Sequence, residues 1–166
     1  FLSRNLLVAL AAFVALTFSA AGISSAFAAR SVRTWYVTLR KPVGNPPALY
    51  FGPVWTALYF LMAVAAWNVW RVGGGWDGAS SAITIFLIQL ALNAMWSVIF
   101  FGLRSPSWAL IEIILLWTVV LATTILFWRI STLSGALIVP YLAWVTYAAY
   151  LNAGIWRLNS LRKNQK

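Results

Sequence analysis

The side chains of this chain that could do chemistry are aromatic rings and amides. The sequence has no Cys and no His, which excludes disulfides, thiolate nucleophiles, imidazole bases and the common zinc, copper and haem ligands. Asp77 and Glu112 are its only acidic residues, and a lone carboxylate does not make a general acid–base pair. We therefore expect no metal site and no required cofactor, and binding is favoured over catalysis.

Tryptophan is the most unusual part of the composition, with eleven residues in a chain of 166. Six fall near the ends of apolar stretches, where aromatic belts at the two membrane interfaces account for them: Trp35, Trp70, Trp76, Trp108, Trp128 and Trp156. Four lie deeper: Trp55, Trp96, Trp117 and Trp144. The flat face of an indole suits a planar aromatic ligand, although simple packing between helices is the alternative for each.

A stripe of polar residues adds to this picture. Gln89, Asn93 and Ser97 repeat at four-residue spacing and so share one helix face. Inside a membrane such residues either hydrogen-bond to neighbouring helices or line a cavity. Glu112 is the one acidic residue within an apolar stretch; we expect it to be structural or gating, by reaching the interface, pairing with Arg104 or holding a proton.

The elements that must position these residues are transmembrane helices. Hydrophobic residues make up 63% of the chain and charged residues 8%, whereas about a quarter of a soluble domain is charged. A β-barrel is disfavoured because runs such as 111–117 do not alternate. We predict an all-α integral membrane protein, a five-helix transmembrane bundle forming a single domain over residues 1–166, with spans at 6–29, 49–70, 79–103, 107–128 and 135–156.

The first span has two interpretations. Its basic start and small residues resemble a secretory signal peptide, but its apolar run is longer than the 7–15 residues of a signal core. Ala11, Ala15 and Ser19 also recur at helical spacing and predict a face for close helix packing. We expect the helix to be retained.

Two further helix faces carry aromatic residues beside small ones. The second span presents Trp55, Leu58, Tyr59 and Met62 on one side, and the fifth presents Tyr141, Trp144, Ala148 and Leu151. Together with the fourth span, these faces could enclose an aromatic pocket.

The first loop, residues 30–48, could cover that pocket. Proline fixes φ and restrains the preceding residue, so this loop should form a semi-rigid extended strap. It is either a lid or an ordinary connector whose Trp35 and Tyr36 rest at the interface. The candidate lid residues are Arg40, Lys41, Pro42, Asn45, Pro46 and Pro47.

The formal charge of +10 is explained by membrane topology. Basic residues stand singly or in pairs between apolar runs, which leaves no platform for nucleic acid. Three Lys and Arg fall on the N-terminal side of the predicted bundle and nine on the side of the first loop and C-terminus. The positive-inside rule therefore predicts a cytoplasmic first loop and C-terminus.

Ordered motifs along nearly the whole chain resemble one family. They include Leu39-Arg40-Lys41-Pro42 with Asn45-Pro46-Pro47, Gly52-Pro53-Val54-Trp55, Gln89-Leu90-Ala91-Leu92-Asn93, Phe100-Phe101-Gly102 and Pro140-Tyr141-Leu142-Ala143-Trp144. On these motifs the chain resembles the TspO or translocator protein family, also called tryptophan-rich sensory protein or peripheral-type benzodiazepine receptor.

The resemblance implies a homodimer in a membrane, either a bacterial cell envelope or the mitochondrial outer membrane. It also implies a pocket under the first loop that binds porphyrins such as protoporphyrin IX, haem, isoquinoline or benzodiazepine-type drugs, and sterols or lipids, in tetrapyrrole regulation, sensing or transport. By matching positions the pocket would include Trp55, Tyr59, Asn93, Trp96, Trp108, Ile111, Leu115, Trp144, Ala148 and Leu151.

Two positions depart from the family pattern. Gly44 stands where many relatives have a Trp in the first loop, so the lid loses a stacking surface. Ala153 stands where the cholesterol motif of animal members has a Tyr, so the resemblance does not extend to specific sterol recognition, which stays open. The resemblance leaves two alternatives to simple binding: porphyrin degradation driven by light and oxygen, with Trp55 and Trp144 as candidate catalytic residues, and transport of porphyrin or sterol.

Overall fold

The computed structural model describes residues 4–164, so Lys166, counted above among the basic residues, lies outside the described part. Five long helices are present, each long and apolar enough to cross a membrane. They are α1 (Arg4–Val32), α2 (Phe51–Val72), α3 (Trp76–Ser97), α4 (Pro106–Ile130) and α5 (Thr132–Lys163). The predicted all-α class and the five spans are confirmed, and α5 extends beyond its predicted span at both ends.

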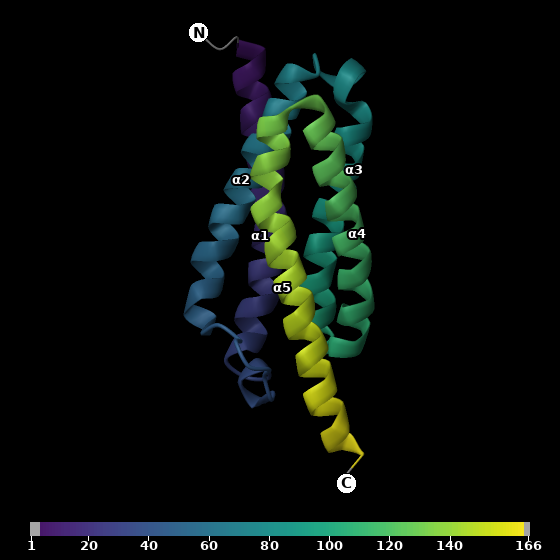
Figure 1. The fold of residues 1–166 in the computed structure, drawn as a ribbon. Helices are drawn as coiled ribbons and strands as arrows, with labels where there is room; N and C mark the ends of the chain where they lie inside the picture. Colours follow the sequence, from purple (N-terminus) through teal and green to yellow (C-terminus); the bar gives the residue numbers. More distant parts are fainter. Residues whose placement is uncertain (1–3, 165–166) are drawn as a thin grey trace.

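The most extensive contacts between the helices form a closed ring, in the order α1, α2, α5, α4, α3 and back to α1, and α2 also touches α3 and α4. The first and last described segments lie at opposite ends of the bundle, as an odd number of spans requires (Figure 1). Internal hydrogen bonding of every helix satisfies the backbone groups that lipid cannot.

Local sequence fixes the tight turn between α4 and α5. Ser131 is the only residue between the two helices, and its extended backbone ends α4 and begins α5. Its side chain accepts a hydrogen bond from the Ser134 backbone N–H, which satisfies one of the free donors at the start of α5. The same pattern starts α4, where Ser105 is the cap and Pro106 takes the first helical position.

One half of the bundle, at the end of the α4–α5 turn, is solidly packed. Met62 and Val69 on α2, Phe86 on α3, and Val120 and Phe127 on α4 are completely buried there. Rings of Phe86 and Phe127 stack with centroids 5.8 Å apart across α3 and α4. The close packing of this half holds the helices together, so the half beside the first loop can contain a cavity.

The first loop runs along α5. Asn159 on α5 donates from Nδ2 to the carbonyl oxygen of Arg40 at 2.9 Å, and its Oδ1 accepts from the Arg40 backbone N–H at 3.1 Å. Tyr150 donates its hydroxyl to the Val43 carbonyl at 3.0 Å. A Cβ on Gly154 would stand 2.7 Å from Pro42, so only glycine admits this close approach. The segment is therefore clamped to α5.

The packing face of α1 differs from the one expected. Ala11, Ala15 and Ser19 are exposed, whereas Phe13 and Thr17 are buried against the bundle. The small-residue stripe therefore makes no close packing within the described chain, because the bulkier face of α1 fills the space beside α2 and α3. In the described structure α1 forms part of the ring of helices.

Candidate functional site

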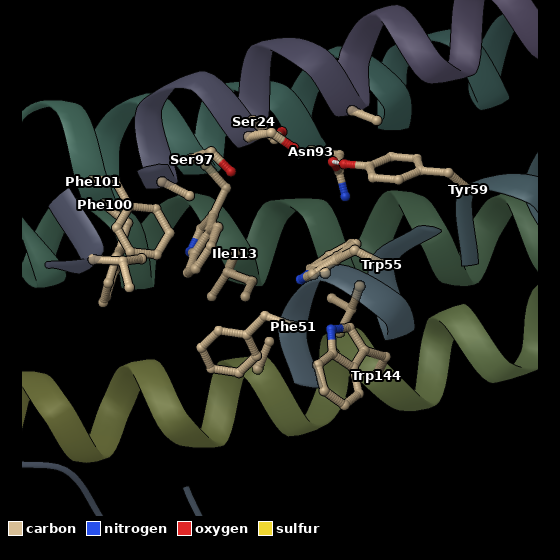
Figure 2. Close-up of a pocket in the computed structure, with 18 of the residues that line it drawn as sticks. Ser24, Phe51, Trp55, Tyr59, Asn93, Ser97, Phe100, Phe101, Ile113 and Trp144 are labelled. Atoms are coloured by element: carbon tan, nitrogen blue, oxygen red, sulfur yellow. Dashed lines mark hydrogen bonds between the residues drawn. The ribbon is translucent and has the colours of Figure 1, made fainter. Parts of the chain in front are cut away.

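A cavity of about 530 Å³ lies in the half of the bundle beside the first loop, within the size range of small-molecule sites. All five helices contribute to its wall. The lining is largely apolar and aromatic, with a few hydroxyl and amide groups among the rings (Figure 2).

Two tryptophans from different helices form one wall. Trp55 on α2 and Trp144 on α5 meet edge to face, with ring centroids 6.2 Å apart and an angle of 88° between the planes. Trp55 also contacts the rings of Tyr59 at 5.6 Å and Tyr141 at 6.3 Å. Ala148, one turn beyond Trp144, lines the cavity with a methyl group and so leaves room beside the indoles. The aromatic faces predicted on the second and fifth spans do meet.

Asn93 ties three helices together at the wall of the cavity. Its Oδ1 accepts a hydrogen bond from the Tyr59 hydroxyl of α2, and its Nδ2 donates to the Tyr141 hydroxyl of α5 at 2.7 Å. Asn93 also lines the cavity, so the two interpretations of the polar stripe are both realised at this residue. Gln89, one turn away, only reaches the sulfur of Met62, at 3.7 Å.

The other wall is built by a wide turn at the end of α3. Residues 98–102 form a π-helical turn in which the Leu103 N–H donates to the Val98 carbonyl at 2.9 Å. The turn lets two consecutive side chains, Phe100 and Phe101, both point inward and be buried. Trp96 stacks on Phe100 with centroids 4.9 Å apart.

A second amide holds Trp96 in place. The indole N–H of Trp96 donates to Asn152 Oδ1 at 3.0 Å, and Asn152 Nδ2 donates to the Pro106 carbonyl at 2.8 Å. Asn152 thus joins α3, α5 and the start of α4 beside the cavity. Sequence analysis did not identify Asn152, which lines the cavity and is 1% exposed.

Sequence reasoning also missed the contribution of α1 and of the loop ends. These lining residues include Phe18, Ser24 and Ala28 on α1, Tyr36 in the first loop, and Ala48 and Phe51 where the loop ends. The small residues of α1 were a usable signal, since they recur every three or four positions through residues 21–28.

Three predicted pocket residues lie elsewhere. Trp108, Ile111 and Leu115 on α4 do not line the cavity and are 66%, 61% and 54% exposed on the outer surface of the chain. The prediction that these three side chains line the pocket is wrong, because α4 turns Ile113 and Leu116 towards the cavity instead. A helix advances 100° per residue, so positions 108, 111 and 115 face away from positions 113 and 116.

Two other predicted pocket residues lie just behind the wall. Leu58 and Tyr141 are 6% and 1% exposed and do not line the cavity. Tyr141 supports the wall through its contacts with Trp55 and Asn93. Met62, on the same predicted face of α2 as Leu58, is also outside the lining and completely buried. The other predicted residues line the cavity: Trp55, Tyr59, Asn93, Trp96, Trp144, Ala148 and Leu151.

Glu112 does not reach the interface. It is 7% exposed, and neither carboxylate oxygen has a hydrogen-bond partner within residues 4–164. No ion pair with Arg104 forms in that range; Arg104 is exposed in the loop before α4. Two predictions for Glu112, that it reaches the interface and that it pairs with Arg104, are therefore wrong. Its position on α4 points the carboxyl into the bundle.

The candidate lid residues do not line the cavity either. Arg40, Lys41, Pro42, Asn45, Pro46 and Pro47 lie outside the lining, and the loop instead closes this end of the bundle through Tyr36 and Ala48. Tyr36 donates its hydroxyl to Asn45 Oδ1 at 3.2 Å, and the Lys41 ammonium stands 4.5 Å from the centre of the Tyr36 ring.

Burial shifts the pKa values of Tyr36 and Lys41 at this end of the cavity. Burial raises the pKa of Tyr36 above its ordinary value, and the hydrogen bond with Asn45 opposes that shift in part. Burial lowers the pKa of Lys41. The loop thus brings the Lys41 ammonium to this end of the cavity, where the Tyr36 ring separates the two.

The side of the cavity between α1 and α2 is thin. Gly22 and Ser25 on α1, with Gly52 and Thr56 on α2, line the cavity and are also exposed on the outer surface. A Cβ added at Gly22 or Gly52 would meet no atom within 4 Å. The cavity therefore opens sideways, towards the region that lipid occupies around a membrane bundle.

Known proteins resemble this chain over most of its length. The family model described as the TspO/MBR family matches residues 11–157. The tryptophan-rich protein TspO of Chlorobaculum tepidum is 39% identical over 92% of this chain and 97% of its own. The translocator protein of Homo sapiens is 40% identical over 75% of each chain. The tryptophan-rich sensory protein of Cereibacter sphaeroides is 41% identical over 75% of this chain and 77% of its own.

Proposed function

This chain belongs to the TspO/MBR family and is a multi-pass membrane protein, and from that premise we propose that its cavity binds a flat, hydrophobic tetrapyrrole. Protoporphyrin IX is the first candidate and haem the second. Binding would serve tetrapyrrole regulation, sensing or transport. Related hydrophobic molecules, including sterols, lipids and isoquinoline or benzodiazepine-type drugs, would compete for the same space.

The observation that carries this proposal is the pair of indoles inside the cavity. Trp55 and Trp144 stand at right angles, so a planar ligand that stacks on one ring meets the edge of the other. Apolar burial and stacking supply the affinity. The chain has no His or Cys, so the proposed site does not depend on strong axial ligation of a metal. A tyrosine could still approach haem iron.

Charge at one end would set the orientation of the ligand. The carboxylates of a porphyrin would face the first loop, where Lys41 stands over Tyr36 and Arg40 is exposed. The apolar edge would then lie deeper, near Ile113 and Leu116.

The test is a titration of purified protein in lipid nanodiscs with protoporphyrin IX, read by quenching of intrinsic fluorescence. We expect Trp55→Phe and Trp144→Phe each to weaken binding by about 2- to 10-fold, which corresponds to the 0.5–1.5 kcal/mol of an aromatic contact. Trp108→Phe is the matched control, since its ring lies outside the cavity and 66% exposed. Equal affinity in all three variants and the parent protein would exclude this cavity as the porphyrin site.

A second candidate function is porphyrin breakdown in light and oxygen. It is favoured by the contact of two oxidisable indoles within the cavity wall. Absorption spectra and product masses after illumination should then differ between the parent protein and Trp144→Phe at equal porphyrin occupancy. Identical products and rates would identify the loss of pigment as ordinary bleaching.

Transport is the remaining alternative. Several relatives carry the name translocator protein, and the sideways opening between α1 and α2 offers a path to lipid. Porphyrin or sterol flux into liposomes that contain the protein, compared with empty liposomes, tests this directly. Equal flux in both preparations would leave binding as the function.

A further inference from the structure

Four aromatic side chains connect the cavity to the edge of the molecule beside the first loop. We infer that Trp55, Trp144, Tyr147 and Tyr150 form a relay that moves an oxidising equivalent from a ligand in the cavity to the protein surface. The inference rests on the proposed porphyrin binding for its natural oxidant. It assigns a redox function to two tyrosines outside the cavity.

The rings are in continuous contact. Centroids lie 6.2 Å apart from Trp55 to Trp144, 5.9 Å from Trp144 to Tyr147, and 6.1 Å from Tyr147 to Tyr150. The last two rings are stacked, with 19° between their planes. Electron transfer between aromatic rings falls steeply with separation, so a series of contacts is much faster than one long step. Every member is tryptophan or tyrosine, the two most readily oxidised aromatic side chains.

The relay ends where a proton can leave. Tyr150 is 51% exposed, and its hydroxyl donates to the Val43 carbonyl in the first loop. Oxidation of a phenol releases its proton, and water at the loop can accept it. Tyr147 likewise donates its hydroxyl to the Gly44 carbonyl, so the last two rings are held at fixed positions beside the strap.

Within residues 4–164, the aromatic routes that leave the cavity through Tyr59, Tyr141 and Trp96 stop inside the protein. Tyr59 and Tyr141 also touch Trp55, but they are 3% and 1% exposed and both hydroxyls are bound to Asn93. Both rings are buried, so neither brings the oxidising equivalent to the surface of the protein. The route from Trp96 passes through Phe100, a ring that resists oxidation.

One electron passes along the relay for each porphyrin that is oxidised. Illuminated porphyrin gives one electron to O₂, which becomes superoxide, or to an added cobalt(III) ammine, which becomes Co²⁺, and the porphyrin becomes a radical cation. That cation takes one electron from the relay and returns to neutral porphyrin. Tyr150 supplies the electron and loses its phenolic proton to water, leaving a neutral tyrosyl radical, which a thiol or ascorbate in the water phase reduces. The cavity indoles are spared permanent oxidation.

The test illuminates porphyrin-loaded protein in nanodiscs with a cobalt(III) ammine as the electron acceptor, freezes it, and records the radical by EPR. The parent protein should give a neutral tyrosyl signal. Tyr147→Phe and Tyr150→Phe should each lose most of that signal at equal porphyrin occupancy, and mass spectrometry should show more oxygen added to Trp55 and Trp144. Tyr147→Trp should restore the signal, because tryptophan is oxidisable although it lacks the phenolic hydrogen bond.

Tyr50→Phe is the matched control, since Tyr50 is 57% exposed and makes no ring contact within residues 4–164. It should leave the tyrosyl signal unchanged. Undiminished signal in Tyr147→Phe and Tyr150→Phe would overturn the relay. So would Tyr147→Trp behaving like Tyr147→Phe, which would assign Tyr147 to holding the strap alone.

Failure of porphyrin binding would be seen separately, in the occupancy measurement. The relay is then tested without ligand by an ultraviolet flash that ionises tryptophan, followed by transient absorption. The tryptophan radical should decay, and the tyrosyl radical appear, faster in the parent protein than in the Tyr147→Phe, Tyr150→Phe double variant. Equal transfer in the two proteins would overturn the relay whatever the natural ligand is.

Discussion

At the scale of single residues, Asn93 makes two buried hydrogen bonds that join α2, α3 and α5. It satisfies the hydroxyls of Tyr59 and Tyr141, which would otherwise be buried in an apolar bundle without partners. A buried polar group that loses its partner is costly because neither lipid nor a packed helix can replace the bond. The residue therefore fixes the wall that holds Trp55.

Replacing Asn93 by leucine should destabilise the protein more than the same change at Gln89. Asn93→Leu strands two hydroxyls, with an expected loss of about 1–3 kcal/mol in the free energy of unfolding. Gln89→Leu breaks only a long contact with the Met62 sulfur and should cost much less. Unfolding in SDS, followed by circular dichroism, measures both. A larger loss at Gln89 would contradict this account.

Tyr36 should make the first loop sensitive to alkaline pH. Its pKa is raised by burial, so in the folded protein it stays protonated after tyrosines of the unfolded chain have ionised. The contribution of Tyr36 to stability is thus complete below about pH 10, the ordinary tyrosine pKa, and is lost as pH rises through the higher folded value.

The comparison of the parent protein with Tyr36→Phe isolates this effect. Phe cannot ionise, so the variant should lose less stability between pH 9 and pH 11 than the parent does, apart from a constant cost for the lost hydrogen bond to Asn45. Thermal unfolding across that pH range is the measurement. Parallel pH profiles for the two proteins would show that the raised pKa has no bearing on stability.

At the scale of elements, the first loop and α5 act as one unit. Asn159 binds both backbone groups of Arg40, and Pro42 packs where Gly154 lacks a side chain. The loop ends, at Tyr36 and Ala48, form part of the cavity wall, so the clamp on α5 also positions that wall.

Gly154→Ala should detach the strap without unfolding the bundle. The added Cβ would stand 2.7 Å from Pro42, which is too close for packed atoms, so the loop must move away. We expect faster amide hydrogen exchange at residues 39–45 and faster tryptic cleavage after Arg40. Gly22→Ala is the control, because its Cβ would meet nothing within 4 Å. Equal exchange in the two variants would show that the strap does not depend on this contact.

At the scale of the whole molecule, the bundle divides into a solid half and a hollow half. Large side chains such as Phe86 and Phe127 fill the first, while the cavity occupies the second beside the first loop. The solid half keeps the helices in place and so fixes the positions of the indoles that line the cavity. A homodimer remains a proposal, and the exposed stripe of Ala11, Ala15 and Ser19 is one surface that could take part.

The charge distribution predicts which end of the molecule faces the cytoplasm. Since the chain has no Cys, a single introduced cysteine reports one position cleanly. Val43→Cys in the first loop, at a residue 90% exposed, should react with a membrane-impermeant maleimide only from the cytoplasmic side. Val72→Cys, at the far end of α2, should react only from the opposite side. The reverse pattern would show that the basic residues do not set the topology.

The sequence alone determined the five spans and three of the helix faces around the cavity. Long apolar runs must be helical in lipid because the backbone has no other hydrogen-bond partners. On α2, α3 and α5, aromatic, polar and small residues recur at helical spacing, so the inward side is marked by the residue types themselves. That is why Trp55, Asn93, Trp96, Trp144 and Ala148 could be identified before the fold was known.

Only the tertiary structure decided the orientation of α4 and the course of the first loop. α4 is apolar on nearly every side, so lipid and protein interior make the same demand on its residues, and Ile111 cannot be told from Ile113 by hydropathy. The clamp between Arg40 and Asn159 joins residues 119 positions apart, a contact that no local pattern encodes. Both were fixed by how neighbouring helices pack, which is a property of the assembled bundle.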